Sequence, residues 1–112
     1  MKLVKKSETT NFSSSTTNIY EYPMDMRLMN GAIAEIKGRY PEKGFAMNEI
    51  SDEIAYVVSG SGEIELPKEK HSIISGDTLY IQHHEQFAWN GNLSIFMVTS
   101  PKFNPKQHKI IL

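Results

Sequence analysis

The sequence contains no cysteine, which excludes disulfide bonds, thiolate metal sites and a cysteine nucleophile. It also has no excess of either charge, because its formal net charge is only -1 at pH 7. This near balance gives no electrostatic reason to expect nucleic acid or an anionic membrane as a partner. No apolar stretch approaches the length of a membrane span, and no apolar run follows Lys2, Lys5 and Lys6 as it would in a signal peptide. We therefore expect a cytoplasmic protein.

Helical periodicity of normal length is also missing, and short alternating segments take its place. A chain of 112 residues has room for one hydrophobic core and therefore for one domain. We predict an N-terminal arm at 1–30, a core at about 31–99 and a C-terminal tail at 100–112. Turn residues separate the expected strands, which lie at 2–6, 19–22, 31–38, 45–48, 52–59, 63–66, 71–74, 78–82, 93–99 and 109–112. This pattern predicts an all-β sandwich or barrel.

The stretch 52–66 is the centre of this prediction. From Glu53 to Val58 both faces are largely apolar, which is typical of a strand covered on both sides. Gly60-Ser61-Gly62 then predicts a hairpin turn, as Asn90-Gly91 does further along the chain. Glu53 is a carboxylate on a face that otherwise belongs inside. Because an unpaired interior carboxylate is strongly destabilising, we expect Glu53 to have a function.

Three other segments have simpler interpretations. The segment 11–18 is polar and low in complexity, so we expect an exposed loop or arm. Asn104 and Pro105 predict one helical turn with an asparagine cap. Three methionines before the core are expected to pack against the barrel, and they are Met24, Met26 and Met29.

The spacing of glutamate and glycine resembles the first motif of the cupins, small jelly-roll barrels built as a double-stranded β-helix. That motif ends in a glutamate followed by six residues and a glycine, which Glu53 and Gly60 match. The second motif opens with a glycine and continues as a turn and a strand, as Gly76 to Ile81 do. The resemblance covers about residues 31–99 and implies a cupin barrel. Because single-domain cupins commonly dimerise, it also implies a homodimer.

The chain departs from the cupin pattern at the residues that usually hold the metal. The paired histidine positions fall on Ala46 and Asn48, or on Met47 and Glu49 with the shorter spacing. The third histidine position falls on Phe87. Alanine, methionine and phenylalanine cannot act as ligands for a hard metal. The usual site of three histidines and one glutamate is therefore absent from the pattern, and we predict no metal and no other cofactor.

The chain also resembles a subgroup of small cupins, a resemblance that implies no particular activity. The shared features are a Tyr-Pro turn, an asparagine before the glutamate, an aromatic pair after the second motif and a Pro…Gln-His tail. In this sequence they are Tyr40-Pro41, Asn48, Glu53, Phe87, Trp89, Pro101 and Gln107-His108.

Glu53 is the first candidate for a site, as a ligand-binding residue and as a tentative catalytic residue. The alternative is that it faces solvent at the barrel mouth or binds backbone amides. Asn48 and Glu49 lie on a neighbouring strand, and one of them should share the pocket wall because adjacent residues face opposite ways. Asn48 beside Glu53 would form a polar pair able to bind a hydroxyl or an amide, although a loop hydrogen bond would explain it equally well.

Phe87 and Trp89 complete the candidate site as an aromatic wall. They lie two residues apart, so both should face the same side, where they would suit a sugar ring, a planar base or another apolar ligand. Core packing is the simpler interpretation for Phe87, whereas Trp89 with its indole donor is the better ligand contact. Tyr40, expected in the core or at the rim, is the last of the candidate ligand-binding residues.

The histidines have weaker signals. His83 and His84 are adjacent, so their side chains diverge on an extended chain, and a surface loop is the simplest interpretation. His71 is a strand residue whose direction the pattern does not predict. For His108 we favour a solvated tail over the alternative that it folds back across the pocket mouth.

Three functions are consistent with these observations. The first is binding of a small molecule, such as a sugar or a small acid, against Glu53, Asn48, Trp89 and Phe87 without the usual metal. The second is an enzyme. It would be either metal-free, with Glu53 as general acid or base in isomerase- or epimerase-like chemistry, or dependent on a divalent metal at a non-standard site. That site would combine Glu49, Glu53 and one histidine. The third is a structural or partner-binding module without a ligand.

Overall fold

The computed structural model describes residues 1–24 and 27–112. Its helical segments in these residues are two short 3-10 turns, η1 (Lys6–Glu8) and η2 (Pro105–Gln107). Neither is long and apolar enough to cross a membrane. The strands are β1 (Thr10–Ser13), β2 (Thr17–Glu21), β3 (Asn30–Tyr40), β4 (Phe45–Asn48), β5 (Asp52–Leu66), β6 (Glu69–Ile74), β7 (Thr78–Ile81), β8 (Ala88–Ser100) and β9 (His108–Ile111).

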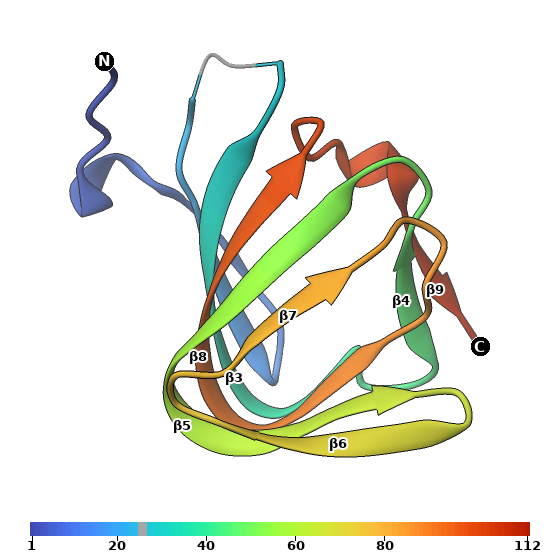
Figure 1. The fold of residues 1–112 in the computed structure, drawn as a ribbon. Helices are drawn as coiled ribbons and strands as arrows, with labels where there is room; N and C mark the ends of the chain where they lie inside the picture. Colours follow the sequence, from blue (N-terminus) through green and yellow to red (C-terminus); the bar gives the residue numbers. More distant parts are fainter. Residues whose placement is uncertain (25–26) are drawn as a thin grey trace.

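Seven strands form one antiparallel sheet in the order β1-β2-β3-β8-β5-β6, with β7 pairing with β5 beside this path. The remaining described strands, β4 and β9, pair with each other in a second, smaller sheet. Figure 1 shows the large sheet curling into a barrel-shaped wall, with β4 and β9 standing across from it. The prediction of an all-β barrel is therefore confirmed.

Two of the predicted turns are wrong. The chain continues as strand through Gly60-Ser61-Gly62 and through Asn90-Gly91, so β5 and β8 are each one long strand. The two glycine segments lie side by side, because Gly62 is opposite Gly91 in the β5–β8 ladder. On the other side of Gly91 lies Gly38 of β3. A row of glycines thus crosses three strands of the sheet.

This glycine row has a steric cause. A Cβ atom at Gly62 would lie 2.3 Å from the carbonyl oxygen of Asn90, and one at Gly91 would lie 2.6 Å from the Cα atom of Gly62. Gly60 and Gly91 also have φ values of +92° and +146°, in the region that favours glycine. Glycine therefore permits two strands to bend and approach closely here, and it does not reverse the chain.

The segment before the predicted core contributes strands to the sheet. Residues 11–18, expected as an exposed loop, contain most of β1 and the start of β2, which corrects that expectation. β2 pairs with β3 in antiparallel register from Thr17 to Glu21. No strand forms at 2–6. Of the three methionines expected to pack against the barrel, Met29 is 49% exposed, Met24 is half-buried and Met26 lies outside the described residues.

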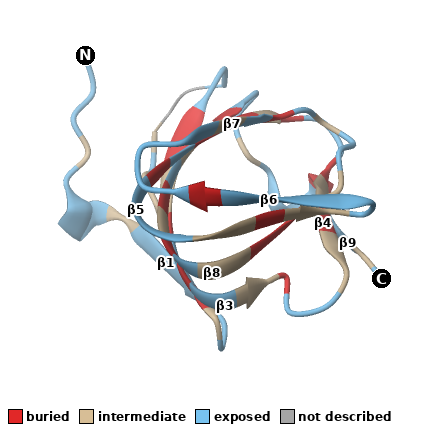
Figure 2. Ribbon diagram, turned by 60° about the horizontal axis from the view of Figure 1, so that its bottom comes forward, coloured by how far each residue is buried: buried red, intermediate tan, exposed pale blue. Residues whose placement is uncertain are grey.

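Inward-facing apolar side chains form one core. Ile36, Val57 and Ile95 have almost no exposed surface, and burying each such side chain contributes about 1.5–3 kcal/mol relative to leaving it in water. Figure 2 shows buried and exposed residues along the same strands, as expected when one face of each strand is covered. The other members of the core cluster are Ala34, Ala46, Ala55, Ile64, Ile73, Ile81, Phe87, Trp89 and Leu93.

The C-terminal tail folds back onto the barrel. As predicted, Asn104 caps the short turn η2, and its side chain accepts a hydrogen bond from a backbone nitrogen within that turn. The buried side chain of Gln107 accepts hydrogen bonds from the backbone nitrogens of Ile50 and Ser51 at 2.8 and 2.7 Å. These bonds tie the tail to the segment after β4, and they place His108 at the start of β9 beside the interior.

Candidate functional site

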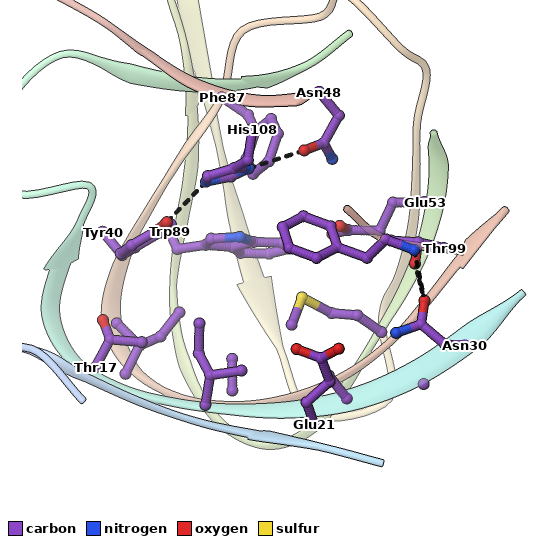
Figure 3. Close-up of a pocket in the computed structure, with 17 residues that line it drawn as sticks. Thr17, Glu21, Asn30, Tyr40, Asn48, Glu53, Phe87, Trp89, Thr99 and His108 are labelled. Carbon is purple, nitrogen blue, oxygen red and sulfur yellow. Dashed lines mark hydrogen bonds between the residues drawn. The ribbon is translucent and has the colours of Figure 1, made fainter. Parts of the chain in front are cut away.

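The inner side of the barrel contains a cavity of about 110 Å³. One ordered water needs only about 10–15 Å³, so the cavity can hold several waters or a small organic molecule. Most of its wall is apolar with a few polar groups, which is the usual composition of a small-molecule site. The lining residues are Thr17, Ile19, Glu21, Asn30, Gly31, Ala32, Ala34, Ile36, Tyr40, Asn48, Glu53, Phe87, Trp89, Met97, Thr99, Phe103 and His108, shown in Figure 3.

Small side chains on β3 help to keep this cavity open. Ala32 and Ala34 line it at successive inward positions, and the next inward residue is the larger Ile36. On the paired strand β8, Ala32 lies opposite Met97. Because protein interiors are otherwise packed to crystal-like density, two alanines at these positions leave volume that bulkier side chains would fill.

Alternation along β5 turns Glu53 inward, as predicted. Ala55 and Val57 are buried with it, whereas Ile54 and Tyr56 face outward. Glu53 is only 5% exposed, and its Oε2 atom has no hydrogen-bond partner among the residues that the structure describes. Burial raises the pKa of the Glu53 carboxyl from 4.5 to about 7, because the charged form loses its hydration. Burial therefore favours the protonated carboxyl well above the pH at which an exposed glutamate ionises.

A chain of hydrogen bonds joins Tyr40, His108 and Asn48 on one side of the cavity (Figure 3). His108 Nδ1 lies 2.8 Å from Asn48 Oδ1, and because that oxygen only accepts, Nδ1 carries a proton. Burial lowers the pKa of His108 and favours the neutral ring, so Nε2 accepts a hydrogen bond from the Tyr40 hydroxyl at 2.8 Å. Burial and the Glu53 carboxylate raise the pKa of Tyr40, so the hydroxyl keeps its proton.

Strand pairing places each member of this chain of hydrogen bonds. Tyr40, the last residue of β3, lies opposite Trp89 on β8. Asn48, the last residue of β4, lies opposite His108, the first residue of β9. The ends of three strands therefore meet at one side of the cavity, and the site depends on the docked C-terminal tail.

A second polar cluster lies beside Glu53. Thr99 pairs with Glu53 across the β5–β8 ladder, and its hydroxyl donates to Asn30 Oδ1 at 2.6 Å. The same oxygen accepts a hydrogen bond from the backbone nitrogen of Phe103 at 2.9 Å. Asn30 and Thr99 thus bind each other, and neither supplies a hydrogen bond to the Glu53 carboxyl.

Phe87 and Trp89 both line the cavity, in agreement with their spacing. Their ring centroids are 6.3 Å apart and their planes meet at 76°, the edge-to-face arrangement that aromatic pairs favour. Both side chains are almost completely buried and belong to the core cluster. They therefore pack the core and form part of the cavity wall at the same time.

Glu49 is the candidate that the structure does not bring to the cavity. It is exposed, and its carboxylate lies 3.6 Å from Lys109 Nζ. Asn48 lines the cavity instead, which agrees with the expectation that one of these adjacent residues shares the wall. Three histidines also lie outside the lining, namely His71, His83 and His84.

The residues at the cupin ligand positions do not fit a metal. Ala46 and Phe87 are buried and apolar, and the Oδ1 atom of Asn48 is bound to His108. In the described part of the chain, no three histidine, cysteine, aspartate or glutamate side chains are grouped so that they could hold a metal ion. Glu49 is exposed outside the cavity, so it does not join Glu53 at a common point.

Sequence reasoning missed several cavity residues. The tail pattern favours solvent exposure for His108, but the structure places it in the cavity wall. Thr17 and Glu21 line the cavity from β2. Their alternation with Ile19 could have indicated a strand with one inward face, but the preceding run of serine and threonine favours a loop. The buried hydrogen bond between Asn30 and Thr99 joins residues that are far apart in the chain, so no local sequence pattern predicts it.

Comparison with models of known protein families finds no match, and comparison with curated protein sequences finds none either. Solved structures do match. Pac13 from Streptomyces, a nucleoside dehydratase of which variants are solved with uridine, has a TM-score of 0.89 at 16% identity, covering 99% of this chain and 91% of its own. Ectoine synthase from P. lautus has a TM-score of 0.78 at 18% identity, over 100% and 91% of the chains. An RmlC-like cupin from Shewanella frigidimarina has a TM-score of 0.69 at 13% identity, over 85% and 86%.

Antiparallel strands that curl around a partly polar cavity place the chain in the class of small jelly-roll barrels. Within that class, the similarity to these solved structures shows that the chain has the cupin fold, as the spacing of Glu53 and Gly60 implied. Fold does not determine function, which depends on the residues that this chain places in its cavity.

Proposed function

We propose that this protein binds a small organic molecule in the barrel cavity without the metal that cupins usually hold. The buried Glu53 carboxyl carries this proposal, because its Oε2 atom has no hydrogen-bond partner among the described residues. An unpartnered buried polar group costs about 1–3 kcal/mol, so packing alone would favour an apolar side chain here. A ligand that supplies the missing hydrogen bond gives Glu53 a reason to be present.

The surroundings of Glu53 support the same proposal. The cavity is not filled by side chains, and its wall combines the Trp89 and Phe87 rings with a few polar groups. Other proteins of this fold act on small molecules, among them the nucleoside dehydratase Pac13 and an ectoine synthase. A sugar or another small molecule of few atoms would match the volume.

Acid–base catalysis is a second candidate function, and one specific observation favours it. Burial brings the pKa of Glu53 to about 7, the range in which a group gives and takes protons most effectively at neutral pH. On another part of the same wall, Asn48 and Tyr40 fix the proton positions of His108. A substrate in the cavity would therefore meet a carboxyl and a hydroxyl–imidazole pair, a combination suited to isomerisation or epimerisation without a metal.

Binding can be followed by the fluorescence of Trp89, the single tryptophan of the chain, which lines the cavity. Sugars, nucleosides, small acids and amines are titrated into the wild type and into Glu53→Gln, with thermal unfolding as a second readout. We expect a ligand to shift the Trp89 emission and raise Tm, with both effects weaker in Glu53→Gln. A ligand that binds both proteins equally and leaves Trp89 unchanged would place binding elsewhere.

Turnover separates the two candidate functions. Each compound that binds is incubated with the protein, and products are followed by NMR and mass spectrometry. Removal of a general acid or base typically costs 10²–10⁴-fold in rate. Loss of turnover in folded Glu53→Gln, on that scale, would establish acid–base catalysis. Unchanged substrate in the presence of bound wild-type protein would leave binding as the function.

We also propose that the chain forms a homodimer through the outer face of β5, β7 and β8. Ile54 lies opposite Tyr80 and Tyr56 lies opposite Phe96, and all four side chains are exposed. Contiguous exposed apolar residues of this kind are typical of protein interfaces. A second copy of the chain would cover the face that the sequence pattern predicts to be buried, and sedimentation analysis tests this directly.

A further inference from the structure

In the described part of the chain, the cavity wall carries negative charge and no positive charge. Its described titratable groups are Glu21 on β2, Tyr40 on β3, Glu53 on β5 and His108 on β9, and no lysine or arginine is among the described lining residues. Burial lowers the pKa of His108, so its ring is neutral near pH 7, and Tyr40 keeps its proton because burial and Glu53 raise its pKa. The charged side chains of the described wall are therefore the two glutamates.

Aromatic side chains form much of the remaining wall. Tyr40, Phe87, Trp89 and Phe103 come from three separate parts of the chain and line the same cavity. Figure 3 shows Trp89 in the middle of this group, with Tyr40 and Glu53 on either side of it. Aromatic rings attract cations through the negative potential of their faces, and the attraction is strongest where water is excluded. Rings together with a carboxylate are the chemistry that recognises ammonium groups.

We propose that the cavity selects a small organic ammonium ion, with its charged nitrogen beside the Glu53 carboxyl and its apolar part against Trp89 and Phe87. This inference rests on the proposed function, because it names the ligand class for the same cavity. Among the described lining residues, a carboxylate or phosphate ligand would meet two acidic groups and no basic one, which disfavours it. An uncharged sugar could bind the carboxyl, but it would gain nothing from the negative character of the wall.

Cation binding must be linked to the ionisation of Glu53. A cation beside the carboxyl favours its charged form, so binding lowers a pKa that is about 7 in the free protein. At pH values below about 7, the carboxyl must lose a proton as the cation binds, and affinity falls by up to about tenfold per pH unit. Above that range the affinity levels off. Choline reports this linkage cleanly because its own charge does not titrate.

Two pairs of isosteres test the charge preference in the whole chain. Choline is compared with neohexyl alcohol, in which a carbon replaces the charged nitrogen. Ethanolamine is compared with n-propanol, in which a methyl group replaces the ammonium group. Titrations at about pH 8 follow Trp89 fluorescence, and we expect each cation to bind about tenfold more tightly than its uncharged isostere.

Two matched variants locate the source of the preference. Glu53→Gln preserves side-chain size and removes the charge, and we expect the advantage of choline to fall to about twofold or less, with its pH dependence lost. Glu35→Gln removes the same charge from an exposed position on β3 that does not line the cavity. We expect Glu35→Gln to keep the full preference of the wild type.

The outcomes distinguish this inference from the proposed function. If the uncharged isosteres bind equally well or better, or if only sugars and acids of the wider compound set bind, the ammonium preference is wrong and binding in the cavity stands. A preference for cations that persists in Glu53→Gln also overturns the inference. If no compound of either set changes Trp89 emission or Tm, both the inference and the proposed function fail.

Discussion

Two neighbouring carboxyl groups on β5 have opposite surroundings. Asp52 accepts hydrogen bonds from the Tyr80 hydroxyl at 2.7 Å and from the His83 backbone nitrogen at 2.9 Å. These bonds lower the pKa of Asp52 to about 2. Glu53 points into the cavity, where Oε2 lacks a partner among the described residues and burial raises the pKa to about 7. Adjacent residues of the strand therefore carry an outer carboxylate with hydrogen-bond partners, Asp52, and an inner carboxyl whose Oε2 atom lacks one among the described residues, Glu53.

The same contrast extends along the two faces of the strand. Ile54 and Tyr56 are exposed on the outer face, whereas Glu53 is buried on the inner one. Burial of apolar surface and hydration of charge favour the opposite arrangement. The exposed apolar side chains and the buried carboxyl each destabilise the isolated chain. Each feature therefore indicates a function in binding. We propose that the inner face binds a small molecule and that the outer face associates with a second copy of the chain.

The largest expected effect comes from removing the inner charge. The folded-state pKa of Glu53, about 7, lies above its ordinary value of 4.5, so ionisation destabilises the fold progressively as pH rises between these values. Above about pH 7 the full decrease in the free energy of unfolding is reached, and it amounts to about 3 kcal/mol. Glu53→Gln should therefore be about 3 kcal/mol more stable than the wild type at about pH 8 and little different near pH 4 in urea unfolding.

The control for this variant is Glu35→Gln, which removes an exposed carboxylate of the same sheet. Glu35→Gln should leave the difference between the free energies of unfolding at the two pH values the same as in the wild type. A Glu53→Gln protein that is less stable than the wild type at both pH values would mean that the carboxyl makes stabilising contacts, and the contrast between the two faces would be lost.

The next effect concerns the outer face. Tyr56→Glu places a charge among exposed apolar side chains, and truncating or charging a central interface residue typically costs about 2 kcal/mol or more. We expect the proposed dimer to dissociate at least about thirtyfold more readily in sedimentation experiments, with the proposed ligand binding in the cavity retained. Ser14→Glu adds the same charge between β1 and β2 and should change neither property. A wild-type chain that sediments as a monomer would refute the assignment of this face.

A smaller effect is expected for the hydrogen bonds around His108. Tyr40→Phe removes the hydroxyl that donates to His108 Nε2 and leaves the ring in place. The lost hydrogen bond should lower the free energy of unfolding by about 1 kcal/mol in urea titrations. A loss confined to substrate turnover, with stability unchanged, would instead assign the hydroxyl to chemistry alone.

The smallest effect is the pH dependence contributed by His108. Burial lowers its folded-state pKa, so its neutral form contributes stability that is present above the ordinary value of 6.5 and is lost as pH falls towards the lower folded value. The Glu53 effect has the opposite sign at mildly acidic pH and masks it. In the Glu53→Gln background, unfolding measurements should therefore show stability falling as the pH is lowered below 6.5. A flat profile there would mean that the ring is not held neutral.

Much of the fold could be predicted because alternation is a local signal. The strands at 31–38, 45–48 and 78–82 and the inward direction of Glu53 follow from residues that are neighbours in the chain. The hairpin turns predicted at the two glycine segments are wrong for a physical reason. Positive φ and close backbone approach require glycine both in a turn and in a bent strand, and the sequence does not tell them apart.

The candidate site was predictable only where the strand pattern fixes it. Asn48 lines the cavity as its strand position suggested, and Phe87 and Trp89 do so as their two-residue spacing suggested. His108 enters the site through the docking of the tail, and Asn30 through its bond to Thr99 across the sheet. These contacts join residues that are distant in the chain, so only the folded arrangement reveals them.

The ionisation of Glu53 provides the most direct test of the central claim. Carbon-13 NMR of the side-chain carboxyl groups, with Glu53→Gln to assign the signal, gives its pKa in the intact chain. We predict a midpoint near 7 for the free protein, because the carboxyl is buried without a partner for Oε2 among the described residues. A midpoint near the ordinary value of 4.5 would mean that the carboxyl is hydrated or already paired. It would contradict both the unpartnered state of the buried carboxyl and the proposed ligand site.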